Sequence, residues 1–335
     1  MSVVVVIVTY GARTKLLKLV LDSIVSDVAV QNIVVVSNGA AADSIALVKS
    51  TPKTQLVVLE GNTGSANGYS VGITTALDKG AERIMLLDDD NAPAPDAVTR
   101  LNEVLDEKAQ RYGFDHVAVL AARRSGDLLH RYPRSSSFMG LHLASICSKL
   151  RHMLFLAEKP PAQECIEVPY GPFGGLFAHR TLYESIGLPN REFVVYADDI
   201  EYTSRIAKAG GKLTLVLPAK IIDVESSWQV VRRVPGALAA VLEPAPFRVY
   251  YTVRNHVWTG RHLLYKSALM YAINKIVYIA IILTLCLIFF RFRRMRLIVR
   301  AISDGERGRL GLCDDYPLPY AAGTRVRMAS GDLTG

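Results

Sequence analysis

Three adjacent aspartates, Asp88 to Asp90, follow an apolar run at residues 82–87. Neighbouring carboxylates repel one another and raise one another's pKa, so fold stability gives no reason to cluster them. Side chains alternate along an extended segment, and Asp88 and Asp90 can therefore share a direction. Mg²⁺ and Mn²⁺ prefer such oxygen ligands, and a metal ion on this pair would neutralise a diphosphate. The alternative is a solvated acidic turn.

A second acidic pair, Asp198 and Asp199, lies at the start of a helical pattern within residues 194–211, and Glu201 follows it. A carboxylate that reaches a hydroxyl group can act as a general base. The alternative is structural, because acidic residues at a helix N-terminus cap the backbone and interact favourably with the helix dipole.

A glycine-rich segment at residues 61–68 reads GNTGSANG and lies between an expected strand and an expected helix. Such a segment lets the backbone approach phosphate groups. It is neither a P-loop, since it lacks the GK[ST] ending, nor a GxGxxG fingerprint. An ordinary turn is the alternative for this segment taken alone.

Short β-branched runs alternate with helical patterns through the first 122 residues, and they must position these clusters. The expected strands lie at residues 3–10, 32–39, 54–61, 82–87 and 115–122, and the expected helices at 15–25, 43–50, 70–80 and 95–110. This rhythm predicts a Rossmann-like α/β fold with a doubly wound, mostly parallel sheet. Ligands of such sheets bind at the carboxyl ends of the strands, where the polar clusters fall.

The last part of the chain contains an apolar run at residues 275–290, followed by the basic segment 291–296. The run is shorter than the roughly 20 residues that span a bilayer, although residues 268–274 extend it. A tilted or re-entrant membrane helix and an interfacial helix both fit, and the arginines suit anionic lipid. A core helix with a basic surface end is the alternative.

The chain of 335 residues carries a net charge of +8, which favours an anionic partner: nucleic acid, a phosphorylated ligand or a membrane surface. Nucleic acid is disfavoured because the basic residues gather beside the apolar run without interleaved aromatics. Four widely spaced cysteines argue against disulfides or a zinc site and favour a reducing compartment. Residues 1–9 lack a basic n-region, so we expect a strand there rather than a signal peptide.

Four donor-side segments, in this order, resemble those of inverting glycosyltransferases of family 2, whose fold is GT-A. VVVIVTYGAR (4–13) is similar to the first strand and nucleotide loop, and IVVVSNG (33–39) to the second strand. EGNTGSANGYSVGI (60–73) resembles the Asn-x-Gly-x-x-x-Gly segment, and MLLDDDN (85–91) the D-x-D site.

The likeness continues to about residue 312. Residues 171–211 resemble the family's acceptor-side block, which ends in its acidic pair. Residues 250–258 and 301–311 are similar to the tail of rhamnosyltransferase- and galactofuranosyltransferase-like members. The resemblance implies a GT-A domain at 1–235, with a nucleotide-sugar half (1–122) and an acceptor half (123–235). A helical membrane-associated region (236–312) and a flexible tail (313–335) would follow.

The resemblance also implies roles for single residues. Asp199 would be the general base, with Asp198 supporting it or contacting the acceptor. Asp88 and Asp90 would bind the diphosphate through Mn²⁺ or Mg²⁺. The donor-binding residues would be Thr9, Tyr10, Arg13, Asn38, Asn62, Asn67, Asp88 and Asp89. The acceptor-side residues would be Gly174, Gly175 and Trp228, although a core tryptophan is an equal alternative for Trp228.

Three positions depart from the family's pattern. Ser37 stands where many relatives have an aspartate that contacts uracil, so dTDP-sugar donors stay open beside UDP-sugars. Gly11 stands where asparagine is usual. Asp223 is nearest to the position of a histidine that can ligate metal, and we expect it to supply a carboxylate ligand or to face a water-filled part of the site. His179 and His256 do not match that position, and we expect ordinary polar roles for both.

The resemblance implies transfer of galactofuranose or rhamnose from a nucleotide donor to a glycan or lipid-linked glycan. The setting would be cell-surface polysaccharide synthesis, such as O-antigen, at the cytoplasmic face of a bacterial inner membrane, with residues 268–300 as a peripheral or monotopic anchor. Pairing of two chains stays open. A metal-dependent nucleotidyltransferase, which would give no role to Asp198 and Asp199, and a non-catalytic GT-A scaffold are the alternatives.

Overall fold

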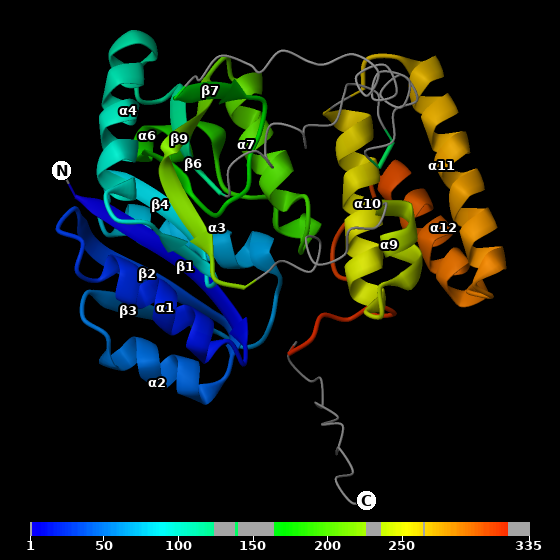
Figure 1. The fold of residues 1–335 in the computed structure, drawn as a ribbon, viewed down its shortest axis with the longest axis horizontal. Coiled ribbons are helices and arrows are strands. Elements are labelled where there is room, and N and C mark those ends of the chain that lie inside the picture. Colours follow the sequence, from blue (N-terminus) through cyan, green and yellow to red (C-terminus); the bar gives the residue numbers. More distant parts are fainter. Residues whose placement is uncertain (1, 124–137, 140–163, 226–235, 264, 321–335) are drawn as a thin grey trace, which may run out of the picture.

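The fold was analysed in a computed structural model that describes residues 2–123, 138–139, 164–225, 236–263 and 265–320. A central sheet with helices on both faces forms one side of the molecule, and a helical bundle forms the other (Figure 1). The C-terminal segment returns from the bundle toward the sheet. The site is built where these parts meet.

The sheet has the strand order β3-β2-β1-β4-β8-β6-β9-β5, and β7 also pairs with β9. The strands are β1 (Val3–Gly11), β2 (Val30–Ala40), β3 (Thr54–Leu59), β4 (Arg83–Asp88), β5 (Asn91–Pro93), β6 (Val117–Ala122), β7 (Cys165–Val168), β8 (Leu176–His179) and β9 (Lys212–Asp223). The first four strands in this order are mutually parallel, as are β6 and β9. The antiparallel β8 separates β4 from β6, which sequence periodicity did not predict.

Helices cover both faces of the sheet, which confirms the doubly wound prediction. One face packs against α1 (Thr14–Ile24), α2 (Ala42–Ser50) and α4 (Ala97–Tyr112). The other packs against α3 (Ser65–Asp78), α6 (Arg180–Ile186) and α7 (Asp198–Lys208). The buried valines of β1 and β2 alternate between the two cores, because successive side chains of a strand point to opposite faces.

Helix α3 begins at Ser65, five residues before the expected start, so half of the glycine-rich segment forms its first turn. This placement matters because it puts Ser65 and Tyr69 of α3 next to the acidic clusters, as described below. The short 3₁₀ helix η1 (Arg191–Phe193) leads into the segment before α7.

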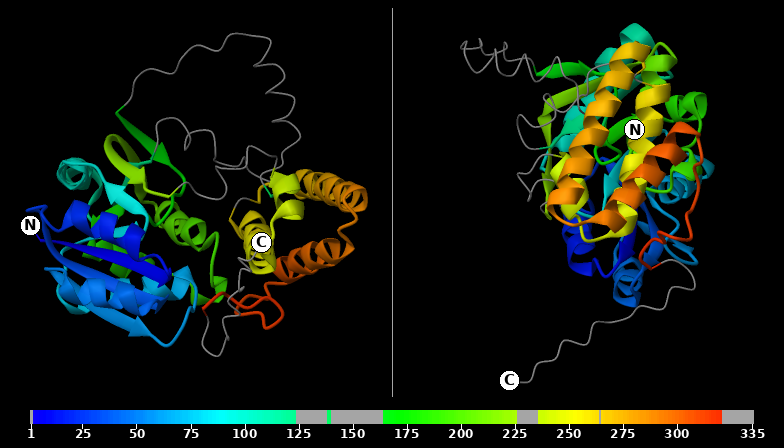
Figure 2. Two further views of the ribbon diagram at one scale, coloured as in Figure 1. Left: turned by 60° about the horizontal axis from the view of Figure 1, so that its bottom comes forward. Right: turned by 90° about the vertical axis from the view of Figure 1, so that its right-hand side faces the viewer.

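The bundle consists of α9 (Gly236–Leu242), α10 (Pro246–His262), α11 (Ala268–Ile288) and α12 (Phe292–Glu306). A third core lies between these helices and includes Tyr251 of α10, Tyr278 of α11 and Ile298 of α12. Val194, which precedes α7, belongs to the same core. The bundle therefore packs directly on the chain segment that leads into the second acidic pair. Helices α11 and α12 form its outer side, away from the sheet (Figure 2).

Candidate active site

The three aspartates lie at the carboxyl end of β4, as predicted, and each is bound by a different set of side chains. Asp89 is buried and accepts hydrogen bonds from Thr9 Oγ1 at 2.7 Å and Arg13 Nε at 2.8 Å. Asp90 accepts a bond from Arg13 Nη2 at 2.8 Å. Arg13, just before α1, thus links two of the three carboxylates.

Burial raises the pKa of Asp89 to about 7, against the opposing effect of Arg13. Burial, followed by the charge of Asp88, raises the pKa of Asp90 to about 6. Ionising Asp89 and Asp90 therefore costs free energy, and this cost would fall if a further cation bound beside them. A solvated turn would not have this property, because exposed carboxylates keep ordinary pKa values.

Asp88 accepts a hydrogen bond from the Tyr69 hydroxyl at 2.6 Å and one from Arg123 Nη2 at 2.9 Å. Its side chain keeps 41% of its surface exposed, so it is the most accessible of the three. Arg123 also donates to Asn91 Oδ1, and its guanidinium lies 3.8 Å from Asp223. Asn91 in turn donates to Asp223 at 3.0 Å.

Asp223 is therefore engaged by Asn91 and Arg123 and does not complete a three-carboxylate cluster with Asp88 and Asp90. Within the described ranges no group of three or more His, Cys, Asp or Glu side chains is arranged to hold a metal ion. Asp223 does lie opposite Asn91 in the pairing of β5 with β9, which keeps it at the edge of the site.

Gly174 lies directly against this network. A Cβ atom built on it would overlap Asn91 Oδ1 and Arg123 Nη2 and would lie 2.8 Å from Asp88 Oδ2. Any larger residue there would have to displace these polar side-chain ends. Gly175 follows with a φ of +96° and donates its backbone N–H to Leu86 O at 2.7 Å. The glycine pair predicted to lie on the acceptor side thus borders the aspartate cluster.

The second acidic pair begins α7 and faces the first. Asp198 is buried and accepts a 2.6 Å hydrogen bond from Ser65 Oγ, while Asp199 is partly exposed and accepts a bond from the Ile200 N–H. Burial raises the pKa of both carboxyls, and the charge of Asp88 raises both further. Ser65 and Tyr69 are one turn apart on α3 and donate to Asp198 and Asp88, so the start of this helix connects the two clusters.

The backbone before the pair is strained. Val194, Tyr196 and Ala197 have φ values of 68°, 67° and 58°, which side-chain-bearing residues rarely adopt. Asn255 of α10 holds this segment: its Nδ2 lies 2.8 Å from the carbonyl oxygens of Phe193, Val195 and Tyr196.

Arg254 orients that amide, since its Nε donates to Asn255 Oδ1 at 2.9 Å and so turns the Nδ2 group toward the carbonyls. Arg254 itself donates to Phe193 O at 3.1 Å and to Gly311 O. Both side chains are buried. Neither residue was assigned a role from its sequence, although an Arg-Asn pair among apolar residues of a helix is a signal of a buried polar contact.

The predicted nucleoside-side residues gather at the ends of β1 and β2 and in the loop after β3. The Arg13 guanidinium lies over the Tyr10 ring, 5.3 Å from its centroid. Asn38 is buried and is occupied by the loop: it donates to Gly64 O at 2.9 Å and accepts from the Thr63 N–H at 2.8 Å. Asn67 donates to Thr63 Oγ1 at 2.8 Å. Asn38 and Asn67 thus hold the loop in shape.

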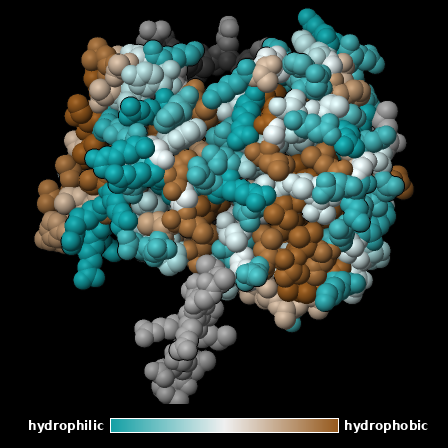
Figure 3. All heavy atoms as spheres, turned by 180° about the vertical axis from the view of Figure 1, so that it is seen from behind, coloured by the Kyte–Doolittle hydropathy of each residue, from teal (hydrophilic) through white to brown (hydrophobic). Residues whose placement is uncertain are grey.

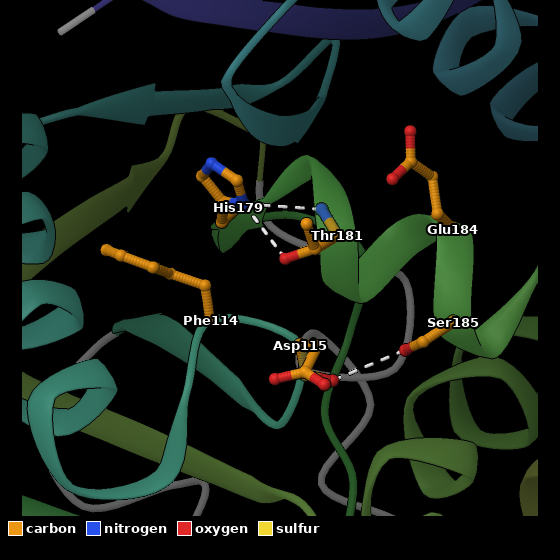
Figure 4. Close-up of a pocket in the computed structure, with 6 residues that line it drawn as sticks. All are labelled: Phe114, Asp115, His179, Thr181, Glu184 and Ser185. Atoms are coloured by element: carbon orange, nitrogen blue, oxygen red, sulfur yellow. Dashed lines mark hydrogen bonds between the residues drawn. The ribbon is translucent and has the colours of Figure 1, made fainter.

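Trp228 and most of the stretch 123–163 lie outside the described residues. Of the two histidines, His256 is bonded to Thr252 O at 2.8 Å within α10. His179 lies at the opposite, amino-terminal edge of β6, beside a surface pocket lined by Phe114, Asp115, His179, Thr181, Glu184 and Ser185 (Figure 4). Its Nδ1 is bonded to Thr181 Oγ1 at 2.9 Å, an ordinary polar contact.

Comparison with known proteins agrees with this geometry. Residues 2–252 match the model of the "Glycosyltransferase like family 2". The chain belongs to this family and is a glycosyltransferase.

Among curated proteins, the chain is 25% identical to the dTDP-rhamnosyl transferase RfbF of Shigella flexneri over 325 residues, 92% of this chain and 97% of that protein. It is also 25% identical to the galactofuranosyltransferase GlfT1 of Mycobacterium tuberculosis over 258 residues, covering 76% and 80% of the two chains.

Two solved structures share the fold. One is Staphylococcus aureus TarS 1-349 in complex with UDP-GlcNAc, with a TM-score of 0.51 and 14% identity over 91% of this chain and 80% of that one. The other is the Pyrobaculum calidifontis mannosyltransferase PcManGT in complex with GDP-Man and Mn²⁺, with a TM-score of 0.50 and 17% identity over 91% and 75%. The predicted GT-A-like α/β fold is confirmed.

Proposed function

We propose that this protein is an inverting glycosyltransferase that moves rhamnose or galactofuranose from a dTDP- or UDP-sugar to a glycan or lipid-linked glycan. The similarity to a dTDP-rhamnosyl transferase and to a galactofuranosyltransferase supports the choice of sugar. The observation that supports the reaction type is the meeting of two acidic clusters at the start of α3. Ser65 of that helix donates to Asp198 at the start of α7, and Tyr69, one turn later, donates to Asp88 at the end of β4.

In this reaction an acceptor hydroxyl oxygen attacks the anomeric carbon and forms the new glycosidic bond. The bond from that carbon to the diphosphate oxygen breaks, and the electron pair leaves with the nucleoside diphosphate. Asp199 takes the hydroxyl proton. Asp198, held by Ser65, keeps α7 and its partner carboxylate in place. One displacement with one base inverts the anomeric configuration.

Asp88 and Asp90 fit a divalent ion because they supply hard oxygen ligands at the strand end. Mg²⁺ commonly uses one or two carboxylates together with substrate phosphates, so this pair would be enough as the protein's share of the ligands. When bound, Mn²⁺ or Mg²⁺ would neutralise charge on the leaving diphosphate. Arg13 and Arg123 add positive charge on either side, and Thr9 and Arg13 hold Asp89 in place.

Nucleotide binding tests this proposal. We expect UDP or dTDP to bind in the presence of Mn²⁺, and Asp90→Ala to weaken that binding by about tenfold or more, because a metal ligand is lost. Titration calorimetry with and without Mn²⁺ measures this. Asp22→Ala, an exposed aspartate on α1, is the matched control and should bind as the wild type does. Absence of binding by the wild type would favour a non-catalytic scaffold.

The pH dependence follows from the raised pKa of the Asp198–Asp199 pair. A general base must be ionised, so the transfer rate should fall as the pH drops through a value above the ordinary carboxyl range of about 4. The carboxyls of Asp198 and Asp199 bind protons more tightly in the folded protein than in the unfolded chain. Protonation of the pair therefore increases the free energy of unfolding on acidification, and this contribution is lost as the pH rises. A rate profile with an acid limb below pH 4 would contradict this assignment.

We also propose that α11 and the start of α12 attach the enzyme to the cytoplasmic face of an anionic membrane. Helix α11 has 21 residues with a mean hydropathy of 2.1, and only 28% of its most apolar window is buried. Exposed apolar side chains continue past its end at Phe289, Phe290 and Phe292. Apolar atoms gather along this edge of the molecule (Figure 3).

One face of α11 packs in the bundle core and the opposite face is open, which favours a helix lying in the interface over one surrounded by lipid. Arg291, Arg293 and Arg296 are exposed beside the apolar surface. We expect their joint reversal to glutamate to lower binding to anionic vesicles about a hundredfold, since each basic residue contributes about 1 kcal/mol.

Vesicle flotation measures this, with phosphatidylcholine vesicles as the neutral comparison. Reversal of Lys15, Lys49 and Lys79, exposed residues of the sheet domain, is the matched control. Equal flotation of both triple variants would show that the three arginines do not contribute to binding anionic lipid.

A further inference from the structure

The C-terminal segment after α12, residues 307–320, crosses from the bundle to the sheet (Figure 1). It is fixed along its length. The Gly311 N–H donates to Glu192 O at 2.6 Å, and the Cys313 N–H donates to the Tyr251 hydroxyl at 3.0 Å. Leu318 is 2% exposed and belongs to the bundle core. The described part of the expected flexible tail is thus a packed strap.

The strap ends on the loop that follows β3. Asn62 donates its backbone N–H to Tyr320 O at 2.9 Å and its Nδ2 to Pro319 O at 2.8 Å. This two-point contact joins residues that are 257 positions apart in the sequence. Asn62, predicted to hold the donor, therefore holds the strap.

Two glycines make room for this contact. Gly11 ends β1 with a φ of +57°, and a Cβ atom on it would lie 2.6 Å from Tyr320 Cε2. Gly39 lies near the end of β2, and a Cβ atom there would lie 2.9 Å from Tyr320 O. The tyrosine ring is thus seated on the end of β1. Gly11, where the family usually has asparagine, is explained by the ring that lies on it.

The sheet topology places a nucleoside beside this ring. The diphosphate belongs at Asp88 and Asp90 on the end of β4, and β1 lies between β4 and β2. Neighbouring strands are about 4.8 Å apart, so a nucleotide that extends from β4 across β1 reaches the end of β2 after roughly 10 Å. That span matches the distance between the diphosphate and the base of a nucleotide. The nucleotide would therefore lie over Thr9–Gly11 and Ser37–Gly39.

Among the described residues at that end of the sheet, few groups are left to recognise a base. Ser37 is 2% exposed, and the Asn38 amide is occupied by the loop. One face of Tyr10 has the Arg13 guanidinium over it. The Tyr320 side chain, in contrast, is 41% exposed. An aromatic ring contributes contact with any pyrimidine, because every base has a π face.

We propose that Tyr320 forms a wall of the donor site and packs against the pyrimidine nucleoside of the donor. The inference rests on the proposed function, since it places a nucleoside diphosphate on β4 and β1. Recognition by ring contact, without a carboxylate at Ser37, accommodates both uridine and thymidine. The C-terminal strap thereby makes the bundle a part of the donor site.

The test is titration calorimetry of the full chain with Mn²⁺ and three ligands: UDP, dTDP and inorganic pyrophosphate. We expect Tyr320→Ala to weaken both nucleotides by about tenfold, within the range known for base–aromatic stacking, and to leave pyrophosphate unchanged. Tyr320→Phe should keep most of the affinity. Tyr265→Ala, a tyrosine of similar exposure in the bundle, is the matched control and should bind all three ligands normally.

Each other outcome overturns the inference. Unchanged nucleotide binding by Tyr320→Ala would show that the ring does not contact the nucleoside. Tighter nucleotide binding would mean that the strap obstructs the site. Equal weakening of pyrophosphate would mean that the strap supports the whole sheet edge and does not contact the nucleoside. If the wild type bound neither nucleotide, the proposed function itself would fail. If the wild type bound and Tyr320→Ala bound equally well, only the role of Tyr320 would fail.

Discussion

Asp199→Asn should reduce sugar transfer by a factor of about 10² to 10⁴ and leave nucleotide binding within about twofold of the wild type. The variant removes the proton acceptor and almost nothing else. Its amide oxygen can still accept the hydrogen bond from the Ile200 N–H, and its side chain keeps the same volume. Steady-state transfer rates and UDP or dTDP titrations on the same preparations measure the two quantities.

Stability separates this effect from unfolding. Burial raises the pKa of Asp199, which means that its charge is unfavourable in the folded protein at neutral pH. The neutral amide should therefore leave the melting temperature unchanged or raise it. Asp115→Asn, at an exposed carboxylate on the far edge of the sheet, is the matched control and should retain full activity. Full turnover by Asp199→Asn would exclude it as the base.

Much of the sheet could be predicted because its signals are local. The continuous apolar runs of β1, β2 and β4 mark strands buried on both faces, and each boundary lies within about two residues of its expected place. The antiparallel β8 was missed, because its four residues lie in a glycine-rich stretch where no period can be read. Its position between β4 and β6 depends on pairing across distant parts of the chain.

The carboxylates of the site could be predicted from their types, but their partners could not. Asp88 and Asp90 stand out in sequence, whereas Arg123 is one of many arginines until the fold brings it to Asp88 and Asn91. The same holds for Tyr320, whose contact with Asn62 closes a very long loop. The position of the family's histidine also suggested a third ligand in Asp223, which the structure instead pairs with Asn91.

The sequence left two alternative functions open, a nucleotidyltransferase and a non-catalytic scaffold, and family membership bears on both. A nucleotidyltransferase would leave Asp198 and Asp199 without a role, and family membership agrees with a glycosyltransferase. A scaffold without activity would have no reason to keep ionisable groups whose pKa values are raised by burial, since such groups lower stability at neutral pH. Raised pKa values of neighbouring carboxyls, here Asp89, Asp90, Asp198 and Asp199, are typical of functional sites, which favours an enzyme over a scaffold.

Asn255→Asp should be among the most damaging single changes in the bundle. The carboxylate has nearly the shape of the amide but no N–H groups, so it would turn an oxygen toward the carbonyls of Phe193, Val195 and Tyr196. We expect the free energy of unfolding to fall by about 2–4 kcal/mol, because buried acceptors lose their donor and face a like charge. Urea denaturation measures this.

The change should also lower the transfer rate at least about tenfold at saturating donor, because the freed segment carries strain that its bonds with Asn255 offset. Relaxation of Val194, Tyr196 and Ala197 would shift the start of α7 and with it Asp199. Nucleotide affinity should fall less than the transfer rate, because this segment meets the donor-side loop through a backbone bond from the Ala66 N–H to Val194 O, whereas Asp199 follows the segment directly in the chain. Thr259→Val is the matched control: Thr259 is buried in the same helix, and its hydroxyl has no hydrogen-bond partner among the described residues. An Asn255→Asp enzyme with reduced stability but normal turnover would show that α10 supports the fold without positioning the base.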